Sequence, residues 1–464
     1  MKLFAGPDIR PPAVAGLFYP AEPEMLAEAV TTYLERTPEA HPAPGFPKAL
    51  IVPHAGYIYS GAVAASAYDL LYPARGVVSR VVLLGPCHRV AVRGLALPAA
   101  RAFDTPLGRV PVDERAVQSI RDLPQVAVSA ATHAQEHALE VQLPFLQRVL
   151  GEFSLVPLVV GSVAPEKVAE VLERLWGGPE TLIVVSSDLS HYHPYEEARR
   201  IDGATVRAIL GFDSGISHEQ ACGATPIAGA LIAAKRRGLA TRLLDSRNSG
   251  DTAGGKEQVV GYASFALEAE GGAGYGAEHG RTLLRIARAS IEESLVGRSG
   301  APSADDPWLK ERRATFVTLQ QDGRLRGCIG SLEAQRPLGE DVAASARAAA
   351  FNDPRFGNLG SAELARTDIE VSLLSAAKRI LFENHAELIA QLRPGVDGVI
   401  LEEGGAESGR RATFLPQVWE GLPDPEQFLA HLMQKAGIAQ NADIRRCSVK
   451  RYSVLKWREL EFGR

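Results

Sequence analysis

The chain has 464 residues, and its 50 lysines and arginines against 55 aspartates and glutamates give a formal net charge of −5. This balance argues against a nucleic-acid partner, and no apolar run approaches the roughly 20 residues that cross a bilayer. Hydrophobic residues make up 46% of the chain and charged residues 23%, as in ordinary globular proteins. Since the start of the chain also lacks the basic and apolar regions of a secretory signal, we expect a cytoplasmic protein without a membrane partner.

At roughly 100–200 residues per domain, the length predicts at least two domains, and a glycine-rich stretch marks the boundary. Five glycines follow closely on a strand-like run that ends at Leu267, which is typical of a linker. A helix from Arg281 to Leu295 should open the next domain. We therefore predict a first domain over residues 1–268, a linker over 269–280 and a second domain over 281–464.

Short β-branched runs alternate with amphipathic stretches over the first domain, a pattern typical of a parallel sheet with helices on both faces. We therefore predict an α/β fold with an αβα sheet domain at the N-terminus. The runs that matter for function are ALIV ending at Val52, RVVLLG ending at Gly85, FSLVPLVVG ending at Gly161 and TLIVVSSD ending at Asp188.

Histidines follow three of these runs: His54 follows the first, His88 the second and His191 the fourth. In an open α/β sheet the carboxyl ends of the strands open onto one crevice, so residues far apart in the sequence can meet there. We therefore expect the three histidines to lie in one site. The alternative for each one alone is a hydrogen-bonded polar residue without a catalytic role.

Cys222 belongs with these histidines because it lies just ahead of a predicted helix, with Thr225 as N-cap and Pro226 as first residue. A helix N-terminus favours the thiolate, which is the form that binds metal. Two imidazoles and one anion leave coordination positions open, as in non-haem Fe(II) sites, and a thiolate also suits copper or zinc. The residues therefore predict a divalent metal without fixing its identity.

A second group of ionisable residues, His133, Glu136, His137 and Glu140, is spaced so that a helix would bring them onto one face. Their order differs from the H-E-x-x-H zinc motif. We predict that His137 and Glu140 contact substrate or support the metal ligands, with a solvated helical face as the alternative. Asp188 should either orient a ligating histidine through its second ring nitrogen or cap the following helix.

Several segments of the first domain carry a resemblance to a known family: AGLFYP, VPHAGYIYSG, LLGPCH, FDTPLG, EHALEVQLPFL, SSDLSHY and CGATPI. Together they resemble the Memo family, which is named for a mediator of cell motility in animals and is widespread in bacteria and archaea. That family is similar in turn to the class III extradiol dioxygenases, whose iron is held by two histidines and a glutamate beside a histidine acid/base. The resemblance implies a dioxygenase-like sheet domain.

The resemblance also implies a role for each candidate residue. His54 and His88 would be metal ligands, and Cys222 would replace the carboxylate ligand. That replacement separates the family from the ring-cleaving dioxygenases. His191 would be the catalytic acid/base, and iron is the first expectation for the metal, with copper and zinc as alternatives. The side chains expected to line the pocket are Tyr57 and Tyr192.

The second domain is smaller and predicts an α+β fold. Its strongest signal is a hairpin, ATFVTLQQDGRLRGCIG, with Asp322 and Gly323 at the turn. An alanine-rich helix from Pro337 to Ala350 follows. Three strand-like runs come after it: DIEVSLL, DGVILEE and RRCSVKRYSVLKW.

In LRGCIGSLEA, Cys328 lies between two glycines at a strand end, two residues after Arg326. Glycines there allow a ligand or another backbone to come close. Arg326 can favour the thiolate of Cys328, which would make this residue catalytic, or bind a carboxylate or phosphate as a fork. The alternative is a small buried cysteine in a hairpin, since free cysteine is among the most buried residue types.

The strings LRGCIGSLEA, AAAFNDPRFGNLGSAEL and IEVSLLS resemble the AMMECR family, which is named from a human contiguous-gene syndrome. Prokaryotic members of this family and of the Memo family are associated with a radical-SAM protein in the AmmeMemoRadiSam system. The chain is therefore similar to a fusion of two components of that system. The fusion implies that both domains act in one pathway, with a radical-SAM protein as partner.

The leading hypothesis is a non-haem metal-dependent oxidoreductase that acts on a small-molecule or peptide substrate. One competing hypothesis is a non-catalytic scaffold that holds a metal or a peptide. Another is a zinc-dependent hydrolase, because three protein ligands and a water also describe catalytic zinc. The identity of the metal separates the oxidoreductase from the hydrolase, and oxygen uptake with a substrate separates it from the scaffold.

Overall fold

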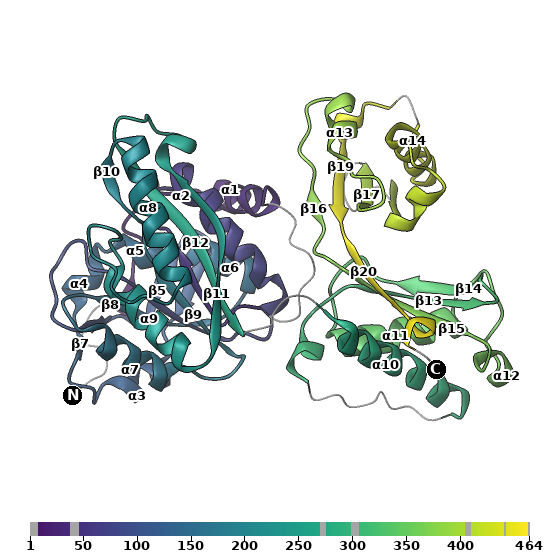
Figure 1. The fold of residues 1–464 in the computed structure, drawn as a ribbon, viewed down its shortest axis with the longest axis horizontal. Coiled ribbons are helices and arrows are strands. Elements are labelled where there is room, and N and C mark those ends of the chain that lie inside the picture. Colours follow the sequence, from purple (N-terminus) through teal and green to yellow (C-terminus); the bar gives the residue numbers. More distant parts are fainter. Residues whose placement is uncertain are drawn as a thin grey trace. The chain divides into compact units, whose positions relative to one another are not determined.

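The computed structural model describes residues 8–37, 46–269, 275–297, 306–403, 410–439 and 442–462. These residues form two compact units that divide between residues 269 and 275 (Figure 1). Of the predicted linker, residues 270–274 lie outside the described residues, and helix α10 (Ala277–Leu295) begins earlier than the predicted Arg281. None of the helices in the described ranges combines the length and hydropathy needed to span a bilayer.

The first unit is built on a nine-stranded sheet with a parallel centre. In spatial order, the central strands are β2 (Ala49–Val52), β9 (Thr181–Ser186), β3 (Arg80–Pro86) and β8 (Ser154–Val160). All residues of β2 and β9 are buried, and so are all residues of β3 and β8 after the first. Burial on both faces explains why these segments appear in the sequence as continuous apolar runs.

The outer strands make the sheet mixed, whereas the sequence predicts a parallel one. On one side β12 (Val259–Ala269) runs antiparallel to β2, and on the other β4 (Leu95–Leu97) runs antiparallel to β8. β12 forms a hairpin with β11 (Leu239–Asn248), and a short connection of this kind cannot carry the chain back for a parallel crossing. The remaining strands are β10 (His191–His193), β7 (Val126–Val128) and a separate small sheet of β1 (Ile9–Arg10), β5 (Ala102–Thr105) and β6 (Gly108–Pro111).

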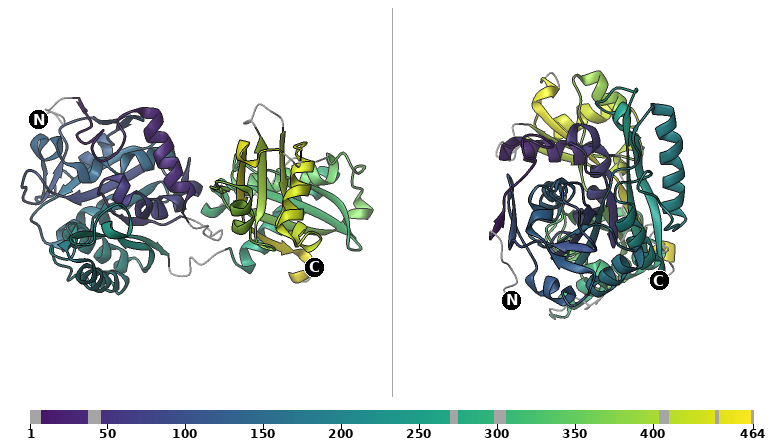
Figure 2. Two further views of the ribbon diagram at one scale, coloured as in Figure 1. Left: turned by 90° about the horizontal axis from the view of Figure 1, so that it is seen from above. Right: turned by 90° about the vertical axis from the view of Figure 1, so that its left-hand side faces the viewer.

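Two groups of helices cover this sheet, which confirms the predicted αβα architecture (Figures 1 and 2). One group consists of α1 (Pro23–Glu35), α2 (Tyr57–Tyr68) and α6 (Leu143–Leu150), which contact one another. The other consists of α3 (Glu114–Ile120), α7 (Pro165–Leu175) and α9 (Ala224–Arg236), while α8 (Tyr195–Leu210) packs on the hairpin of β11 and β12. The buried side chains of the strands and both helical groups form one hydrophobic core.

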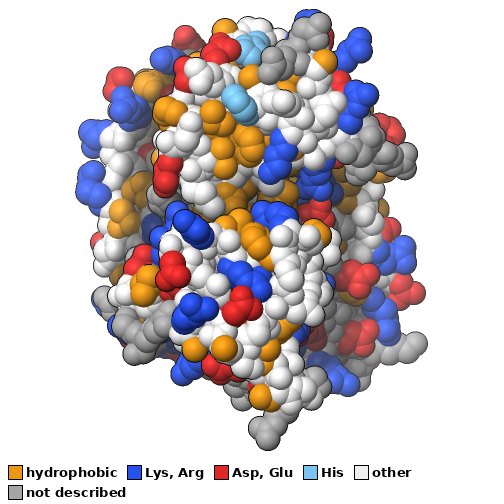
Figure 3. Space-filling model, turned by 90° about the vertical axis from the view of Figure 1, so that its right-hand side faces the viewer, with side chains coloured by type: hydrophobic (Ala, Val, Ile, Leu, Met, Phe, Trp, Pro, Cys, Tyr) orange, Lys and Arg blue, Asp and Glu red, His pale blue; other side chains and the backbone are white. Residues whose placement is uncertain are grey.

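The second unit contains two four-stranded antiparallel sheets, as expected for an α+β fold. The first consists of β14 (Arg324–Gly330), β13 (Thr315–Gln321), β15 (Asp368–Leu374) and β20 (Val454–Arg458). The second consists of β16 (Lys378–Arg379), β19 (Cys447–Tyr452), β17 (Gly398–Glu403) and β18 (Arg410–Phe414). Helices α10 and α11 (Leu338–Phe351) share a core with the first sheet, and α13 (His385–Gln391) and α14 (Pro425–Lys435) share one with the second. Figure 3 shows basic and acidic side chains interspersed over one face of this unit.

The predicted hairpin of the second unit is confirmed, since β13 pairs with β14 around Asp322 and Gly323. Both turn residues have positive φ, 49° and 75°, which is the backbone that a two-residue hairpin turn requires. The run RRCSVKRYSVLKW is wrong as a single strand, because β19 and β20 belong to different sheets. The chain changes sheets at Ser453, whose backbone N–H donates to the hydroxyl of Ser375 at 2.9 Å instead of joining a strand ladder.

Two glycines of the RGCIG string are explained by packing. A Cβ atom at Gly327 would lie 2.1 Å from the carbonyl oxygen of Ala349 in α11, and one at Gly330 would lie 2.2 Å from that of Thr315. Both distances are far shorter than van der Waals contact. The glycines therefore allow α11 and β13 to approach β14 closely.

We expect Gly327→Ala to destabilise the second unit by about 1–3 kcal/mol, because the added methyl group forces α11 away from the sheet. The measurement is the midpoint of denaturant unfolding. Gly339→Ala is the matched control, since its nearest contact would be an ordinary 3.6 Å to Leu309. That variant should stay within about 1 kcal/mol of the wild type, and an equal loss in both variants would contradict the packing explanation.

Candidate metal site

His54 lies directly beyond β2 and is held by the end of the neighbouring strand β9. Its backbone N–H donates to Asp188 Oδ1 at 2.7 Å, and its Nδ1 lies 2.9 Å from the hydroxyl oxygen of Ser186. The Ser186 hydroxyl donates its own hydrogen to the carbonyl of Ala138 at 2.7 Å, so it can only accept from His54. The ring proton of His54 is therefore on Nδ1, and the lone pair of Nε2 faces Cys222 Sγ.

His88 lies directly beyond β3, and one carboxylate holds it at two points. Its backbone N–H donates to Glu136 Oε2 at 2.7 Å, and its ring Nδ1 lies 2.8 Å from Glu136 Oε1. Burial raises the pKa of Glu136, but the hydrogen bonds from His88 and from the backbone outweigh it and hold that pKa at about 2. Because Glu136 is ionised at neutral pH, His88 donates from Nδ1 and its Nε2 also keeps its lone pair.

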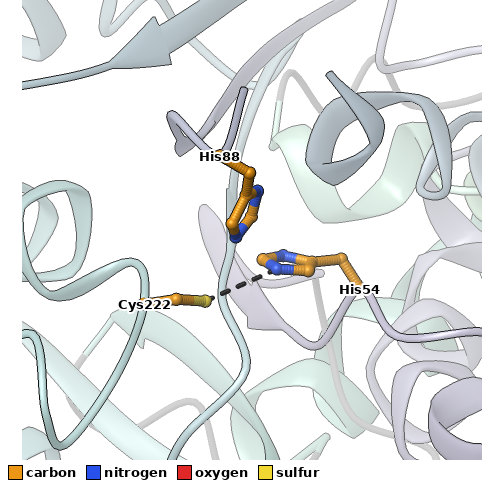
Figure 4. Close-up of side chains that lie close together, drawn as sticks. All are labelled: His54, His88 and Cys222. Carbon is orange, nitrogen blue, oxygen red and sulfur yellow. Dashed lines mark hydrogen bonds between the residues drawn. The ribbon is translucent and has the colours of Figure 1, made fainter. Parts of the chain in front are cut away.

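Cys222 approaches these two imidazoles from a third segment of the chain, just ahead of α9 (Figure 4). Its Sγ lies 3.4 Å from Nε2 of His54 and accepts from the backbone N–H of Asp188 at 3.3 Å. One ligand atom from each of His54, His88 and Cys222 lies within 4.8 Å of the others. The structure therefore brings the three predicted metal ligands together.

The start of α9 corrects two details of the sequence prediction. The helix begins at Ala224 with Gly223 as its N-cap, so Thr225 is not the cap, and its hydroxyl instead lies 3.1 Å from His218 Nε2. The thiolate expected of Cys222 is also wrong for the metal-free protein, because burial and the nearby charge of Asp188 raise its pKa to about 12. A metal that binds Cys222 must displace its proton.

Burial keeps two histidines of the cluster, His54 and His137, neutral. It lowers the pKa of His54 well below the usual value, and the neighbouring His88 adds to this effect. Burial likewise lowers the pKa of His137 to about 4. The ring of His137 lies against that of His88, with centroids 4.6 Å apart, and its buried Nδ1 has no hydrogen-bond partner among the described residues. His137 therefore belongs to the cluster as an uncharged ring.

The sequence predicts one helical face for the second group of ionisable residues, and this prediction is wrong. The group consists of His133, Glu136, His137 and Glu140. The helix is interrupted here: α4 (Ala130–Ala134) ends and α5 (His137–Glu140) begins as a separate helix. His133 bonds the carbonyl of Ala96 at 2.8 Å, away from the ligands. Glu136 is free to reach His88 because it lies at the break, as the N-cap of α5, rather than inside a helix.

Glu140 is fully buried and bonds the N-terminal segment rather than the ligands. Its carboxylate accepts from Arg10 Nη1 and the Tyr19 hydroxyl, each at 2.6 Å, and from the backbone of Ala13 at 2.7 Å and Val14 at 3.0 Å. Breaking a buried ion pair of this kind costs about 3–5 kcal/mol. The contacts of Glu140 therefore fasten residues 10–19 to α5.

Asp188, His191 and the two predicted pocket tyrosines lie at different depths. Asp188 is buried, and burial raises its pKa while the bond from His54 opposes the rise. His191 lies in β10. Burial is the main reason that the pKa of His54 is lowered, and His191 adds to this effect. The Tyr192 side chain is 69% exposed, and Tyr57 is buried with its hydroxyl donating to the Val141 carbonyl at 2.8 Å.

In the second unit, Arg326 and Cys328 bond different partners. Arg326 donates two hydrogen bonds to the carboxylate of Glu363, at 3.1 and 3.2 Å. The carboxylate that the sequence predicted as its partner is therefore a side chain of the same protein. The Cys328 sulfur accepts from the hydroxyl of Thr318 at 3.3 Å. Burial raises the pKa of Cys328, which favours the thiol over the nucleophilic thiolate. Asp353, from the second motif, accepts from the backbone of Cys328 at 2.9 Å.

Sequence reasoning assigned no role to Ser186 and Glu136, the two residues that fix the histidine rings. Glu136 was visible as an acidic residue beside His137, but only the tertiary structure shows that it reaches His88. Ser186 gave a weaker signal, as a small polar residue at the end of an apolar strand. Both act from segments distant in sequence from the ring that they hold.

The fold and the site define a two-domain chain whose N-terminal αβα sheet domain gathers two histidines and a cysteine beside the ends of its parallel strands. The chain belongs to the Memo-like protein family, whose model matches residues 10–266. Residues 284–457 match the AMMECR1 family. The chain is therefore a fusion of a Memo-like domain and an AMMECR1 domain.

Relatives of the first domain occur in archaea and bacteria. A MEMO1 family protein of Archaeoglobus fulgidus is 37% identical over 276 residues, which cover 56% of this chain and 99% of that relative. One of Aquifex aeolicus is 38% identical over 267 residues, covering 55% of this chain and 97% of that relative. Among solved structures compared with the whole chain rather than with the first domain, an uncharacterized protein from Pyrococcus horikoshii is 32% identical, with a TM-score of 0.36, over 39% of this chain and 91% of its own.

We expect the alkylation rate of Cys222 by iodoacetamide to rise about tenfold per pH unit up to pH 9, without a plateau, because only the thiolate reacts. This follows from the pKa of about 12 in the metal-free protein. Peptide mapping by mass spectrometry measures the rate at this cysteine, and Cys222→Ser identifies the peptide. Burial slows the reaction at every pH but leaves the slope intact, so a plateau between pH 7 and 8 would contradict the raised pKa.

Proposed function

We propose that the Memo-like domain is a non-haem metal-dependent oxidoreductase whose metal is held by His54, His88 and Cys222. The observation that carries this proposal is the convergence of three possible ligand atoms, one from each of His54, His88 and Cys222, within 4.8 Å of one another. They come from three separate segments of the chain, and one of them is a buried thiol. Both imidazoles bond their supporting groups through Nδ1, and Nε2 of His54 already faces Cys222 Sγ at 3.4 Å.

The residues present fit a divalent metal. Two imidazole nitrogens and one thiolate make a mixed ligand set that iron, copper and zinc all accept, and three protein ligands leave positions open for substrate. Iron is our first choice, because the related dioxygenases use it. A redox-active metal at this position would supply electron transfer between a bound substrate and dioxygen.

The protein's own contribution is to hold the ligands, exclude water and move protons. His54 and His137 are neutral and buried, so they add no charge that would repel a cation. His191 is the residue we assign to proton transfer, because it is close to the cluster and only partly buried. A histidine in this role contributes typically about 10²–10⁴-fold to the rate. Asp188 helps to hold both His54 and Cys222 through its hydrogen bonds.

The AMMECR1 domain extends this proposal to a pathway. We place the chain in the AmmeMemoRadiSam system, with a radical-SAM protein as partner and a small molecule or a peptide as substrate. The support is the fusion itself, since one chain carries both the Memo-like and the AMMECR1 domain. Cys328 remains our candidate for chemistry in the second domain, and its raised pKa means that a partner or substrate would have to activate it.

The metal content of purified variants tests the proposed ligands. Protein purified without oxygen and reconstituted with Fe²⁺ should contain about one metal per chain. His54→Ala with His88→Ala should lose it, and Cys222→Ser should weaken binding, whereas His191→Ala should keep it. His193→Ala is the matched control, because its ring faces Glu197 rather than the cluster.

Three outcomes of the metal measurement would redirect the proposal. Equal metal content in the double variant and the control would rule out the assigned ligands. Zinc as the tightly bound metal, with no oxygen consumption in the presence of a reductant, would favour the hydrolase instead. Absence of metal from every reconstituted preparation would leave the scaffold as the better explanation.

We also expect metal affinity to rise about tenfold per pH unit between pH 6.5 and 8.5, because binding displaces one proton from Cys222. The thiol has a pKa of about 12, so it is protonated throughout this range, and every unit of pH raises the thiolate fraction tenfold. His54 adds nothing, since its pKa lies well below the range. Chelator competition measures the slope, and an affinity independent of pH would mean that Cys222 does not bind as a thiolate.

A further inference from the structure

Glu136 is a buried carboxylate that none of the assigned roles uses. Its side chain is 1% exposed, and no arginine or lysine is paired with it among the described residues. Both oxygens are used by the loop after β3 and the start of α5. Oε2 accepts from the backbone N–H of His88 at 2.7 Å, while Oε1 lies 2.8 Å from His88 Nδ1 and accepts from Ala138 N at 3.0 Å.

This geometry has a direct effect on the ring of His88. An imidazole with an acceptor at Nδ1 keeps its proton there, and its Nε2 lone pair is available to a metal. The second bond, from the backbone N–H of the same residue, fixes the carboxylate relative to that ring. Glu136 therefore sets both the tautomer and the direction of His88.

Glu136, His88 and His137 are also close enough to one another to form a metal site of their own. Two observations favour a hydrogen-bonded support instead. The carboxylate and His88 Nδ1 are already bonded to each other at 2.8 Å, and the rings of His88 and His137 lie nearly parallel, with 26° between their planes. A metal in this second group would have to break the bond that orients His88 toward the first.

We propose that Glu136 is the positioning residue of the metal site: it holds the proton of His88 on Nδ1 and directs Nε2 toward His54 and Cys222. The expected effect of Glu136 on metal binding rests on the proposed function. The predicted tautomer of His88 does not, because it is a property of the metal-free protein. Support of this kind typically affects metal affinity by about 10- to 100-fold.

The same α5 motif, EHALE, provides a matched control in Glu140. Both carboxylates are buried and ionisable residues of one short segment, and both accept several hydrogen bonds. Glu140 bonds Arg10, Tyr19 and the backbone of the N-terminal segment, which contains none of the assigned metal ligands. The same substitution at the two positions therefore separates loss of support at the metal from loss of packing.

The first experiment compares Glu136→Gln with Glu140→Gln by titrating each full-length variant with Co²⁺ under argon. A glutamine has one acceptor oxygen, so it cannot satisfy both N–H groups of His88, and turning its amide toward Nδ1 forces the ring proton onto Nε2. We expect Glu136→Gln to lose about 10- to 100-fold in affinity and to change the thiolate-to-cobalt absorption. Glu140→Gln should lower the melting temperature and keep the wild-type affinity.

Wild-type affinity in folded Glu136→Gln would overturn the inference, and so would an equal loss of affinity in Glu140→Gln. The second experiment needs no variant and no metal. In protein labelled with ¹⁵N-histidine, nitrogen shifts should show the Nδ1–H tautomer for His88, with the signal assigned by His88→Gln. The Nε2–H tautomer would overturn the inference even if Glu136→Gln fails to fold. If the wild type binds no Co²⁺ but shows the Nδ1–H tautomer, the proposed function fails while the role of Glu136 in orienting the ring stands.

Discussion

The position of a single proton on each of two imidazole rings, the buried His54 and the partly exposed His88, would decide whether the candidate site of the Memo-like domain can bind a metal. A ring that carries its proton on Nε2 would direct an N–H bond at the other ligands and exclude a cation. Ser186 prevents this at His54, because its hydroxyl already donates to Ala138 and can only accept from the ring. Glu136 prevents it at His88 by accepting at Nδ1. The ligands therefore depend on β9 and α5, not only on the strands that they follow.

The need to keep the ring protons of His54 and His88 on Nδ1 explains why many buried polar groups of the first unit lie around these two rings. Gln142 donates a hydrogen bond to the Ser186 hydroxyl at 2.8 Å and accepts one from the Tyr68 hydroxyl at the same distance. Ser186, which accepts from His54, is therefore itself held in place. Glu140 fastens the N-terminal segment, which brings the ring of Phe18 to 4.8 Å from that of His137. Ser186 and Gln142 are each bonded on two sides, which rigidifies a buried polar network. The segments around the candidate site form one connected network.

The sequence predicted which side chains converge at the candidate site but not what orients them, and the reason is physical. His54 and His88 follow buried apolar strands, and the carboxyl ends of neighbouring parallel strands must lie together, so local pattern and general topology were sufficient. Ser186 and Glu136 act across distances of 132 and 48 residues in the sequence, which no local pattern records. The thiolate expected of Cys222 was wrong for a related reason, since the helix start was visible in the sequence but the burial of the thiol was not.

The charges at the candidate site would suit a divalent ion. Glu136 is ionised at neutral pH, and Cys222 would give up its proton on becoming a ligand, so the two would supply two negative charges beside the neutral imidazole of His54. A divalent cation balances that total, and a buried site is most stable when its charges cancel.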